Sequence, residues 1–98
     1  MVYDITERLK FNEDPVLIIK GKKFTIRSDA EVVLQLMGIL TDKGEFAGAT
    51  EAMKLLLSAE DHKKLSALHL KVEDYVAVMK AAVDLAIGED PGEEFKGE

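Results

Sequence analysis

The sequence predicts a mainly α-helical (α+β) domain, in which an N-terminal β-hairpin precedes a small bundle of three to four helices. Two observations support this fold class. Residues 16–27 (VLIIKGKKFTIR) hold two runs rich in β-branched and aromatic residues on either side of a glycine-lysine turn. From residue 30 onward, apolar side chains recur every three or four residues, which is the spacing of one helix face.

Composition narrows the class of protein. The chain has 98 residues, enough for one domain with a single core. It contains no cysteine, which excludes disulfides and cysteine-bound metals, and its net charge of −6 disfavours nucleic-acid binding. No apolar run approaches the roughly 20 residues of a membrane span, and the first residues lack the layout of a signal peptide. We therefore expect a cytoplasmic protein whose partners are neither nucleic acid nor membrane.

The chain divides into three predicted parts. Residues 1–14 form an arm with a short helical turn behind Asp4, residues 15–88 form the single domain, and residues 89–98 form a disordered acidic tail. Four basic residues and no acidic ones lie within residues 16–28, whereas residues 88–98 hold five acidic residues and one lysine. These oppositely charged segments either attract each other or are solvated separately.

The hairpin is expected to turn at Gly21–Lys22, because glycine at the first central position suits a type II′ turn. Counting outward from that turn pairs Ile19 with Phe24 and Leu17 with Ile26, and these four side chains form the predicted buried face. An isolated two-stranded hairpin is only marginally stable, so it needs to pack on the helices or pair with a neighbouring subunit.

The first helix is predicted to begin at a capping box, in which Ser28 and Glu31 satisfy each other's backbone amides. It runs to about Leu40, and its core stripe comprises Val32, Val33, Leu36, Met37 and Leu40. Residues 41–48 are expected to form a loop, because Gly44 signals a turn. Phe46 in this loop is expected to fold inward onto the core. The alternative is that Phe46 is an aromatic contact for a partner.

Three further helices are predicted. Residues 49–57 form one that buries Ala52, Met53, Leu56 and Leu57. Ser58 is expected to cap the next, which ends near Leu68. The apolar rhythm continues unbroken across residues 59–87, as in one long helix, but acidic residues 73 and 74 resemble a new first turn and favour a break near Leu70. The last helix starts at Val72, and Gly88 in the left-handed conformation ends it. Because this helix is apolar nearly all round, either the domain surrounds it or part of it contacts another chain.

No arrangement typical of catalysis or cofactor binding is present. The chain has no GxSxG, HExxH, EF-hand or dinucleotide-binding pattern, and Gly21 lies at a hairpin tip rather than in a phosphate loop. His62 and His69 lie seven residues apart, about 10 Å along a continuous helix, which is too far to share a metal without other ligands. The sequence therefore predicts a non-enzymatic binding protein without cofactor or metal.

Three segments carry a family resemblance: residues 16–40 (VLIIKGKKFTIRSDAEVVLQLMGIL), 49–68 (ATEAMKLLLSAEDHKKLSAL) and 70–90 (LKVEDYVAVMKAAVDLAIGED). In the last, a tyrosine follows two acidic residues, an Ala-Ala pair lies in mid-helix and a glycine-glutamate pair closes it. Together they resemble the small tail assembly chaperones of long-tailed, siphovirus-type phages and prophages of Gram-positive bacteria. The likeness covers nearly the whole chain and depends on pattern and order rather than on an invariant chemical motif.

The resemblance implies a mostly helical homo-oligomer made in the cytoplasm of the bacterial host. Such a chaperone binds the tape measure protein and keeps it soluble until the tail tube protein, a further implied partner, replaces it. It is absent from the mature virion. Family members are often made in two forms, the longer one by ribosomal frameshifting, and the family supplies no catalytic residues to carry over.

Five apolar side chains are candidate partner contacts. Leu34 and Ile39 lie off the core stripe of their helix, Val78 and Leu85 flank the stripe of the last helix, and Phe46 is the aromatic described above. The first four form a groove for self-association or for the client protein, or else a compact bundle buries them. Two other functions remain open, a structural or connector subunit of a phage tail and an acidic inhibitor or mimic that binds a basic partner.

Overall fold

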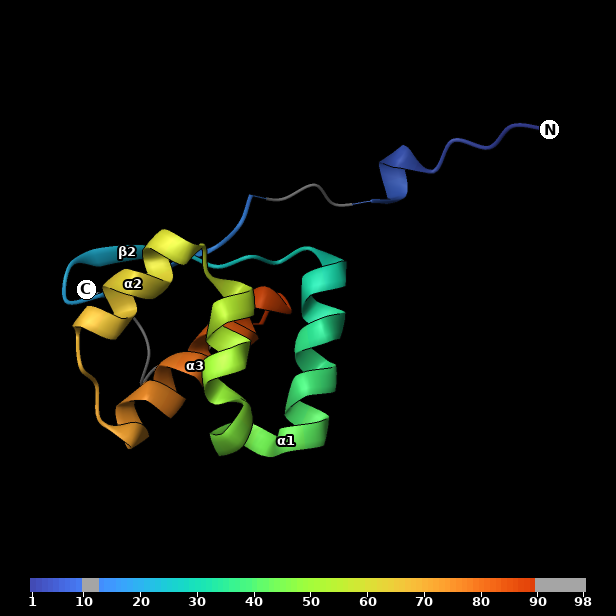
Figure 1. Ribbon diagram of the computed structural model, residues 1–98. Helices are drawn as coiled ribbons and strands as arrows, with labels where there is room; N and C mark the ends of the chain where they lie inside the picture. The colour runs from blue at the N-terminus through green and yellow to red at the C-terminus, as the bar shows by residue number, and fades with distance from the viewer. Residues whose placement is uncertain (10–12, 90–98) are drawn as a thin grey trace.

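A β-hairpin and a group of helices form the body of the protein, and an N-terminal arm leads away from it (Figure 1). This computed structural model describes residues 1–9 and 13–89, so the predicted acidic tail lies outside the described residues from residue 90 onward. The predicted fold class is confirmed. The elements are a 3-10 turn η1 (Thr6–Arg8), strands β1 (Val16–Ile19) and β2 (Lys22–Thr25), and helices α1 (Ala30–Leu56), α2 (Ala59–Ala67) and α3 (Val72–Ala86).

The hairpin turn differs from the expected one. Ile19 pairs with Lys22 and Leu17 pairs with Phe24, so the two central residues are Lys20 and Gly21. Their φ angles of 50° and 76° are both positive, as a type I′ turn requires. The predicted type II′ turn and its register are therefore wrong, because Lys20 accepts a left-handed conformation that lysine rarely adopts.

The buried face of the hairpin is nevertheless the predicted one. The register is displaced by two residues, and a displacement of two keeps every side chain on its own face of the sheet. Phe24 and Ile26 are buried, and Leu17 and Ile19 pack against the same core. The amide of Ile26 donates to the carbonyl of Pro15 at 2.8 Å, which continues the ladder beyond the strands.

Side chains of helix α2 hold the hairpin by hydrogen bonds to the outer edge of β2. The amide of Thr25 donates to Asp61 at 3.1 Å, and the Nζ of Lys64 donates to the carbonyl of Lys23 at 3.0 Å. The same ammonium lies 5.1 Å from the centre of the Phe24 ring, within the range of a cation–π interaction. α2 thus binds β2 through polar groups of its own side chains.

The start of α1 does not contain the predicted capping box. The Ser28 hydroxyl donates instead to Asp14 at 2.7 Å, and the Ser28 amide donates to the same carboxylate oxygen at 3.2 Å. Asp29 is the N-cap residue and makes no side-chain cap. Ser28 lies one residue before the N-cap, so its hydroxyl is not placed to accept the Glu31 amide, and its bond to a charged carboxylate is stronger than one to a neutral acceptor.

Helix α1 bends sharply at Gly44, which has φ 80° and ψ 177° inside an otherwise helical segment. The predicted loop over residues 41–48 is wrong, since helix continues up to Gly44 and resumes directly after it. We call residues 30–43 the first arm of α1 and residues 45–56 the second arm; they lie side by side (Figure 1). Gly48 permits close approach, because a Cβ there would lie 3.2 Å from the Cγ2 of Ile39.

The ends of α2 and α3 follow the predictions. The Ser58 hydroxyl accepts the amide of Asp61 at 3.1 Å and caps α2. His69, with φ 49°, lies in the break between α2 and α3. Gly88, with φ 86°, ends α3, where the Glu89 amide bonds the Asp84 carbonyl at 2.8 Å in a Schellman arrangement. Two helices rather than one therefore occupy residues 59–86.

One hydrophobic core joins these elements. α3 crosses behind the two arms of α1 in Figure 1 and supplies Val76, Met79, Ala82 and Ala86 to this core. The predicted core residues Ala52, Met53 and Leu56 of the second arm and Leu57 at its C-cap are all buried, and in the first arm Leu36 is fully buried. Met37, predicted for the core, is exposed instead. In the described part of the chain, no helix is long and apolar enough to cross a membrane.

Candidate partner-binding groove

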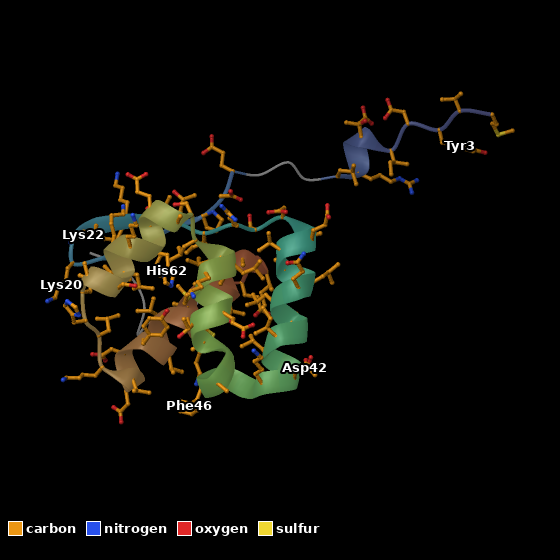
Figure 2. All side chains as sticks on the ribbon, viewed as in Figure 1. Tyr3, Lys20, Lys22, Asp42, Phe46 and His62 are labelled. Carbon is orange, nitrogen blue, oxygen red and sulfur yellow. The ribbon has the colours of Figure 1, made fainter. Side chains whose placement is uncertain are left out.

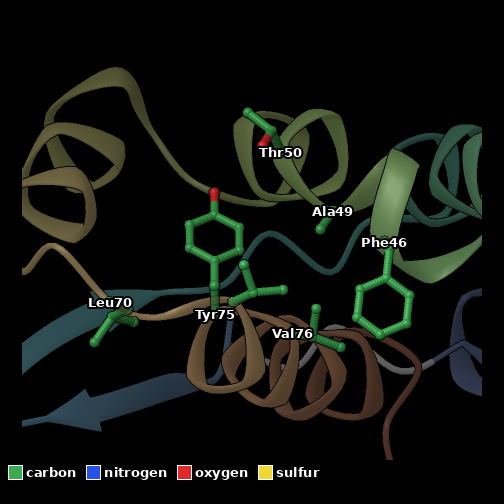
Figure 3. A pocket seen from close by; sticks show the side chains of 7 residues that line it. Phe46, Ala49, Thr50, Leu70, Tyr75 and Val76 are labelled. Atoms are coloured by element: carbon green, nitrogen blue, oxygen red, sulfur yellow. The ribbon is translucent and has the colours of Figure 1, made fainter.

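An apolar groove of about 300 Å³ opens between the second arm of α1 and the beginning of α3 (Figure 3). Phe46 and Leu70 lie at opposite ends of the group of side chains, with Tyr75 and Val76 between them (Figure 3). The lining residues are Phe46, Ala49, Thr50, Leu70, Val72, Tyr75 and Val76. The groove therefore combines large apolar side chains with two hydroxyl groups.

Two local features place the exposed rims of this groove. Phe46 lies two residues beyond the Gly44 bend, at the free end of the second arm, and is 70% exposed. Val72 is the first residue of α3, where no preceding helical turn covers it, and is 66% exposed. Val76, one turn after Val72, and Ala49 are both buried and form the floor. Neither rim has a place in the core of this molecule.

Tyr75 supplies the polar edge of the groove. Burial raises the pKa of the Tyr75 phenol above its ordinary value of 10.0, and the hydrogen bond with the Thr50 side chain partly opposes this rise. Figure 3 shows the Tyr75 hydroxyl directed toward the arm that carries Thr50. The phenol is therefore neutral at physiological pH, so the groove gains a hydroxyl but no charge.

This environment predicts an alkaline titration of Tyr75 with a midpoint above 10.0. The chain has two tyrosines, so in a Tyr3→Phe variant the phenolate absorbance reports Tyr75 alone. Since the folded state holds the proton more tightly than the unfolded state, stability is expected to fall as pH rises above about 10. Thr50→Val is expected to raise the midpoint further. A midpoint at or below the ordinary value would contradict the buried placement of this ring.

Ion pairs brace the elements around the groove. Lys43 on the first arm of α1 pairs with Glu51 on the second, and Lys80 on α3 pairs with Glu45 at 3.3 Å. These side chains are about half exposed, and such pairs contribute at most about 1 kcal/mol each. Their main effect is on charge, because each neutralises a carboxylate of the second arm.

A second hollow, of about 460 Å³, follows the groove along the second arm of α1. Thr50 lines the groove, whereas Lys54, one helical turn later, and Leu57, the C-cap residue of α1, line the second hollow. Among the described residues, no carboxylate lies within ion-pairing distance of the three cations that line it, Arg27, Lys54 and Lys63. We call this second hollow the cationic hollow.

The structure places the five candidate contacts in different environments. Phe46 lines the groove, so the expectation that it folds inward onto the core is wrong (Figure 2). Leu34 is 70% exposed on the first arm of α1, away from the groove. Ile39 is partly buried between the arms, and Val78 and Leu85 are partly buried against the core.

The sequence does not indicate the other rim of the groove. The spacing of Val72 and Tyr75 fits the buried stripe of the last helix, and Leu70 marks only the expected break. The available signal is the position of Val72 in the first turn of its helix, directly before two acidic residues. Such a position lies at the end of the packed surface, and its exposure depends on how far the neighbouring helix extends.

The histidines and the metal-binding residue types form no further site in the described residues. His62 is partly buried beside the cationic hollow, with its Nε2 atom enclosed and without a hydrogen-bond partner there, and His69 is exposed in the break. Within residues 1–9 and 13–89, no three or more histidine, cysteine, aspartate or glutamate side chains are grouped to hold a metal.

No family model, no curated protein and no solved structure matches this chain.

Proposed function

We propose that this chain is a phage tail assembly chaperone that holds an apolar helical segment of the tape measure protein and keeps it soluble during tail assembly. The observation that supports this proposal is the apolar groove with Phe46 and Val72 on its rims. Small soluble domains rarely leave two large apolar side chains beside a preformed hollow unless another chain covers them. The resemblance of the sequence to these chaperones supplies the identity of the client.

The energetics favour an apolar client. Covering a largely exposed phenylalanine or valine side chain yields roughly 1.5–3 kcal/mol each. The groove volume of about 300 Å³ accommodates a few side chains from one face of a helix. The two rims therefore supply a substantial part of the affinity that a micromolar complex needs, about 8 kcal/mol. The hydroxyls of Tyr75 and Thr50 add hydrogen-bonding groups that orient the bound segment.

The charge pattern disfavours an acidic mimic. Glu45 and Glu51 on the second arm of α1 are each paired with a lysine, and the cationic hollow is lined by Lys54 of the same arm. A surface that imitates nucleic acid instead needs a continuous run of unpaired carboxylates.

A structural subunit of the tail differs from a chaperone in its final location, since a structural subunit is retained in purified particles. Mass spectrometry of those particles distinguishes the two.

The groove is tested by co-expression with the tape measure protein encoded nearby. The wild-type chain is expected to keep that protein in the soluble fraction. A Phe46→Ser/Val72→Ser variant is expected to retain the fold, because both side chains are exposed, and to weaken client binding by at least about tenfold. Soluble client and complex are measured by size-exclusion chromatography with light scattering.

Leu34→Ser is the matched control, because Leu34 is as exposed as Phe46 but lies outside the groove. It is expected to leave client binding unchanged. Loss of binding in the Leu34 variant with retention in the groove variant would move the client site to the first arm of α1. A client that aggregates equally with and without the wild-type chain would contradict the chaperone proposal.

A further inference from the structure

Strand β1 has an outer edge whose backbone groups have no partner. The amide of Ile26 donates to the carbonyl of Pro15, and hydrogen-bonded pairs alternate with non-bonded pairs along an antiparallel ladder. The backbone amides and carbonyls of Val16 and Ile18 therefore point away from β2. Among residues 1–9 and 13–89, no hydrogen bond reaches these four groups. They are free to pair with another strand.

The two edges of the hairpin differ in their partners. On β2, α2 already hydrogen-bonds the outward amide of Thr25 and the outward carbonyl of Lys23. The sequence of β1, VLII, contains no charge and no proline to discourage pairing. Pro15 directly before it faces β2, so its missing amide does not interrupt the outer edge. The edge of β1 is thus the one that stays open to a further strand.

β1 is also the less covered strand of the hairpin. On the inner face, Phe24 of β2 is 1% exposed, whereas Leu17 and Ile19 of β1 are only partly buried. On the outer face, Val16 and Ile18 are 49% and 45% exposed. A strand beside β1 would therefore cover apolar surface on both faces of the sheet, which favours its binding.

We propose that β1 of one molecule pairs antiparallel with β1 of a second copy of this chain, about a two-fold axis at Leu17. Val16 then hydrogen-bonds Ile18 of the second copy, and Ile18 hydrogen-bonds Val16 of the second copy. Leu17 faces Leu17 of the second copy as a non-hydrogen-bonded pair, with the Cα atoms about 4.5 Å apart. All four outward backbone groups of each β1 gain partners in this register.

The strand is complementary to itself, and this selects a second copy over an unrelated extended chain. Its two outward-facing residues lie two positions apart, so a two-fold axis midway between them pairs each with the other. A register displaced by two residues in either direction would instead pair Val16 or Ile18 with a residue outside the strand. The register about Leu17 also places Asp14 of one copy opposite Lys20 of the other, at both ends of the pair.

This interface is separate from the apolar groove. The residues that line the groove belong to the second arm of α1 and to residues 70–76, and none belongs to β1. The proposal therefore does not depend on the client, and a dimer would carry two grooves. Client binding and dimerisation are expected to respond to different substitutions.

Light scattering over a series of protein concentrations tests the pairing. The wild type is expected to change from monomer to dimer as its concentration rises. The lysine variant, Val16→Lys/Ile18→Lys, places like charges opposite each other and is expected to dimerise at least about tenfold more weakly. The glutamate variant, Val16→Glu/Ile18→Glu, is expected to behave in the same way. An equal mixture of the two variants places unlike charges opposite each other and is expected to form a heterodimer.

Leu34→Ser is the control for these variants, because Leu34 is an exposed apolar residue on α1 rather than on the hairpin. It is expected to dimerise as the wild type does. Circular dichroism confirms that each variant is folded, which is expected because the substituted side chains are exposed.

Cysteine crosslinking tests the register, because the chain has no cysteine of its own. Diamide serves as the oxidant and takes up the two hydrogens of the paired thiols. Leu17→Cys is expected to form a disulfide-linked dimer, since the two copies of residue 17 face each other across the axis. Ile19→Cys is the matched control on the same inner face. Its two copies would lie about 13 Å apart, so it is expected to stay unlinked.

The proposal is overturned if the wild type stays monomeric at millimolar concentration, if the folded lysine variant dimerises as well as the wild type, or if the mixed variants do not associate. Crosslinking of Ile19→Cys as fast as Leu17→Cys would also overturn it. A chain that is monomeric alone, and whose lysine variant loses the client, would assign the edge of β1 to the client instead. A lysine variant that is monomeric yet solubilises the tape measure protein supports both proposals, whereas a β1 dimer that never holds the client supports the pairing and removes the chaperone function.

Discussion

Replacing Leu36 with alanine is expected to lower the free energy of unfolding by about 2–5 kcal/mol. Leu36 is 0% exposed in the first arm of α1 and belongs to the same buried cluster as Phe24 and Met53. Truncation removes apolar contacts and leaves a cavity that the two arms of α1 and the hairpin cannot fully close. Chemical denaturation in urea, followed by circular dichroism, measures the loss.

Leu34→Ala is the matched control, since it is the same substitution two residues away on the same arm. Leu34 is largely exposed, so the expected change is within about 0.5 kcal/mol. Similar losses of stability at both positions would contradict the assignment of Leu36, rather than Leu34, to the side of α1 that faces the core. This pair also bears on function, because a Leu34 variant that is fully stable is a sound control for the groove.

Replacing Gly44 with alanine is expected to cost about 1–3 kcal/mol. The residue has φ 80° and ψ 177°, a region of backbone space that is essentially confined to glycine. A Cβ at this position would meet no neighbouring atom within 4 Å, so the cost comes from the backbone itself. The substitution is also expected to weaken partner binding, because the sharp bend orients Phe46 at the rim of the groove.

Gly38→Ala is the opposite control in the same helix. Gly38 is helical, exposed and free of contacts at its Cβ position, so alanine there is expected to stabilise the protein by about 0.5–1 kcal/mol. Thermal unfolding of the two variants is therefore expected to shift in opposite directions. Stabilisation by both would mean that α1 is straight at Gly44, and the groove as described would not exist.

Local chemistry explains which parts of the fold were predictable. Ser58 and Gly88 act on residues within one or two helical turns, and both act as the sequence predicts. The buried face of the hairpin was also predictable, because alternation specifies the face even when the register is wrong by two residues. These three features were confirmed, whereas the capping box at Ser28 and the type II′ turn, which also depended on near neighbours, were wrong.

Features set by distant contacts were not predictable. Ser28 donates a hydrogen bond to Asp14 across the base of the hairpin, and no local sequence pattern predicts that partner. The single-residue bend at Gly44 depends on the two arms of α1 packing together, with Gly48 opposite Ile39. The groove depends on the same packing, so Phe46 could be proposed as a contact from the sequence, whereas Val72 could be placed beside it only in three dimensions.

The polar contacts between α2 and β2 limit how the sheet can grow. Asp61 and Lys64 occupy the outward-facing amide of Thr25 and carbonyl of Lys23, so this edge cannot accept another strand. In the described part of the chain, no helix side chain bonds the outer edge of β1. Two molecules that paired through β1 would form four strands with both outer edges closed by α2. Such a sheet would end at two molecules, and the closed β2 edge already limits fibre formation by a hairpin with exposed Val16 and Ile18.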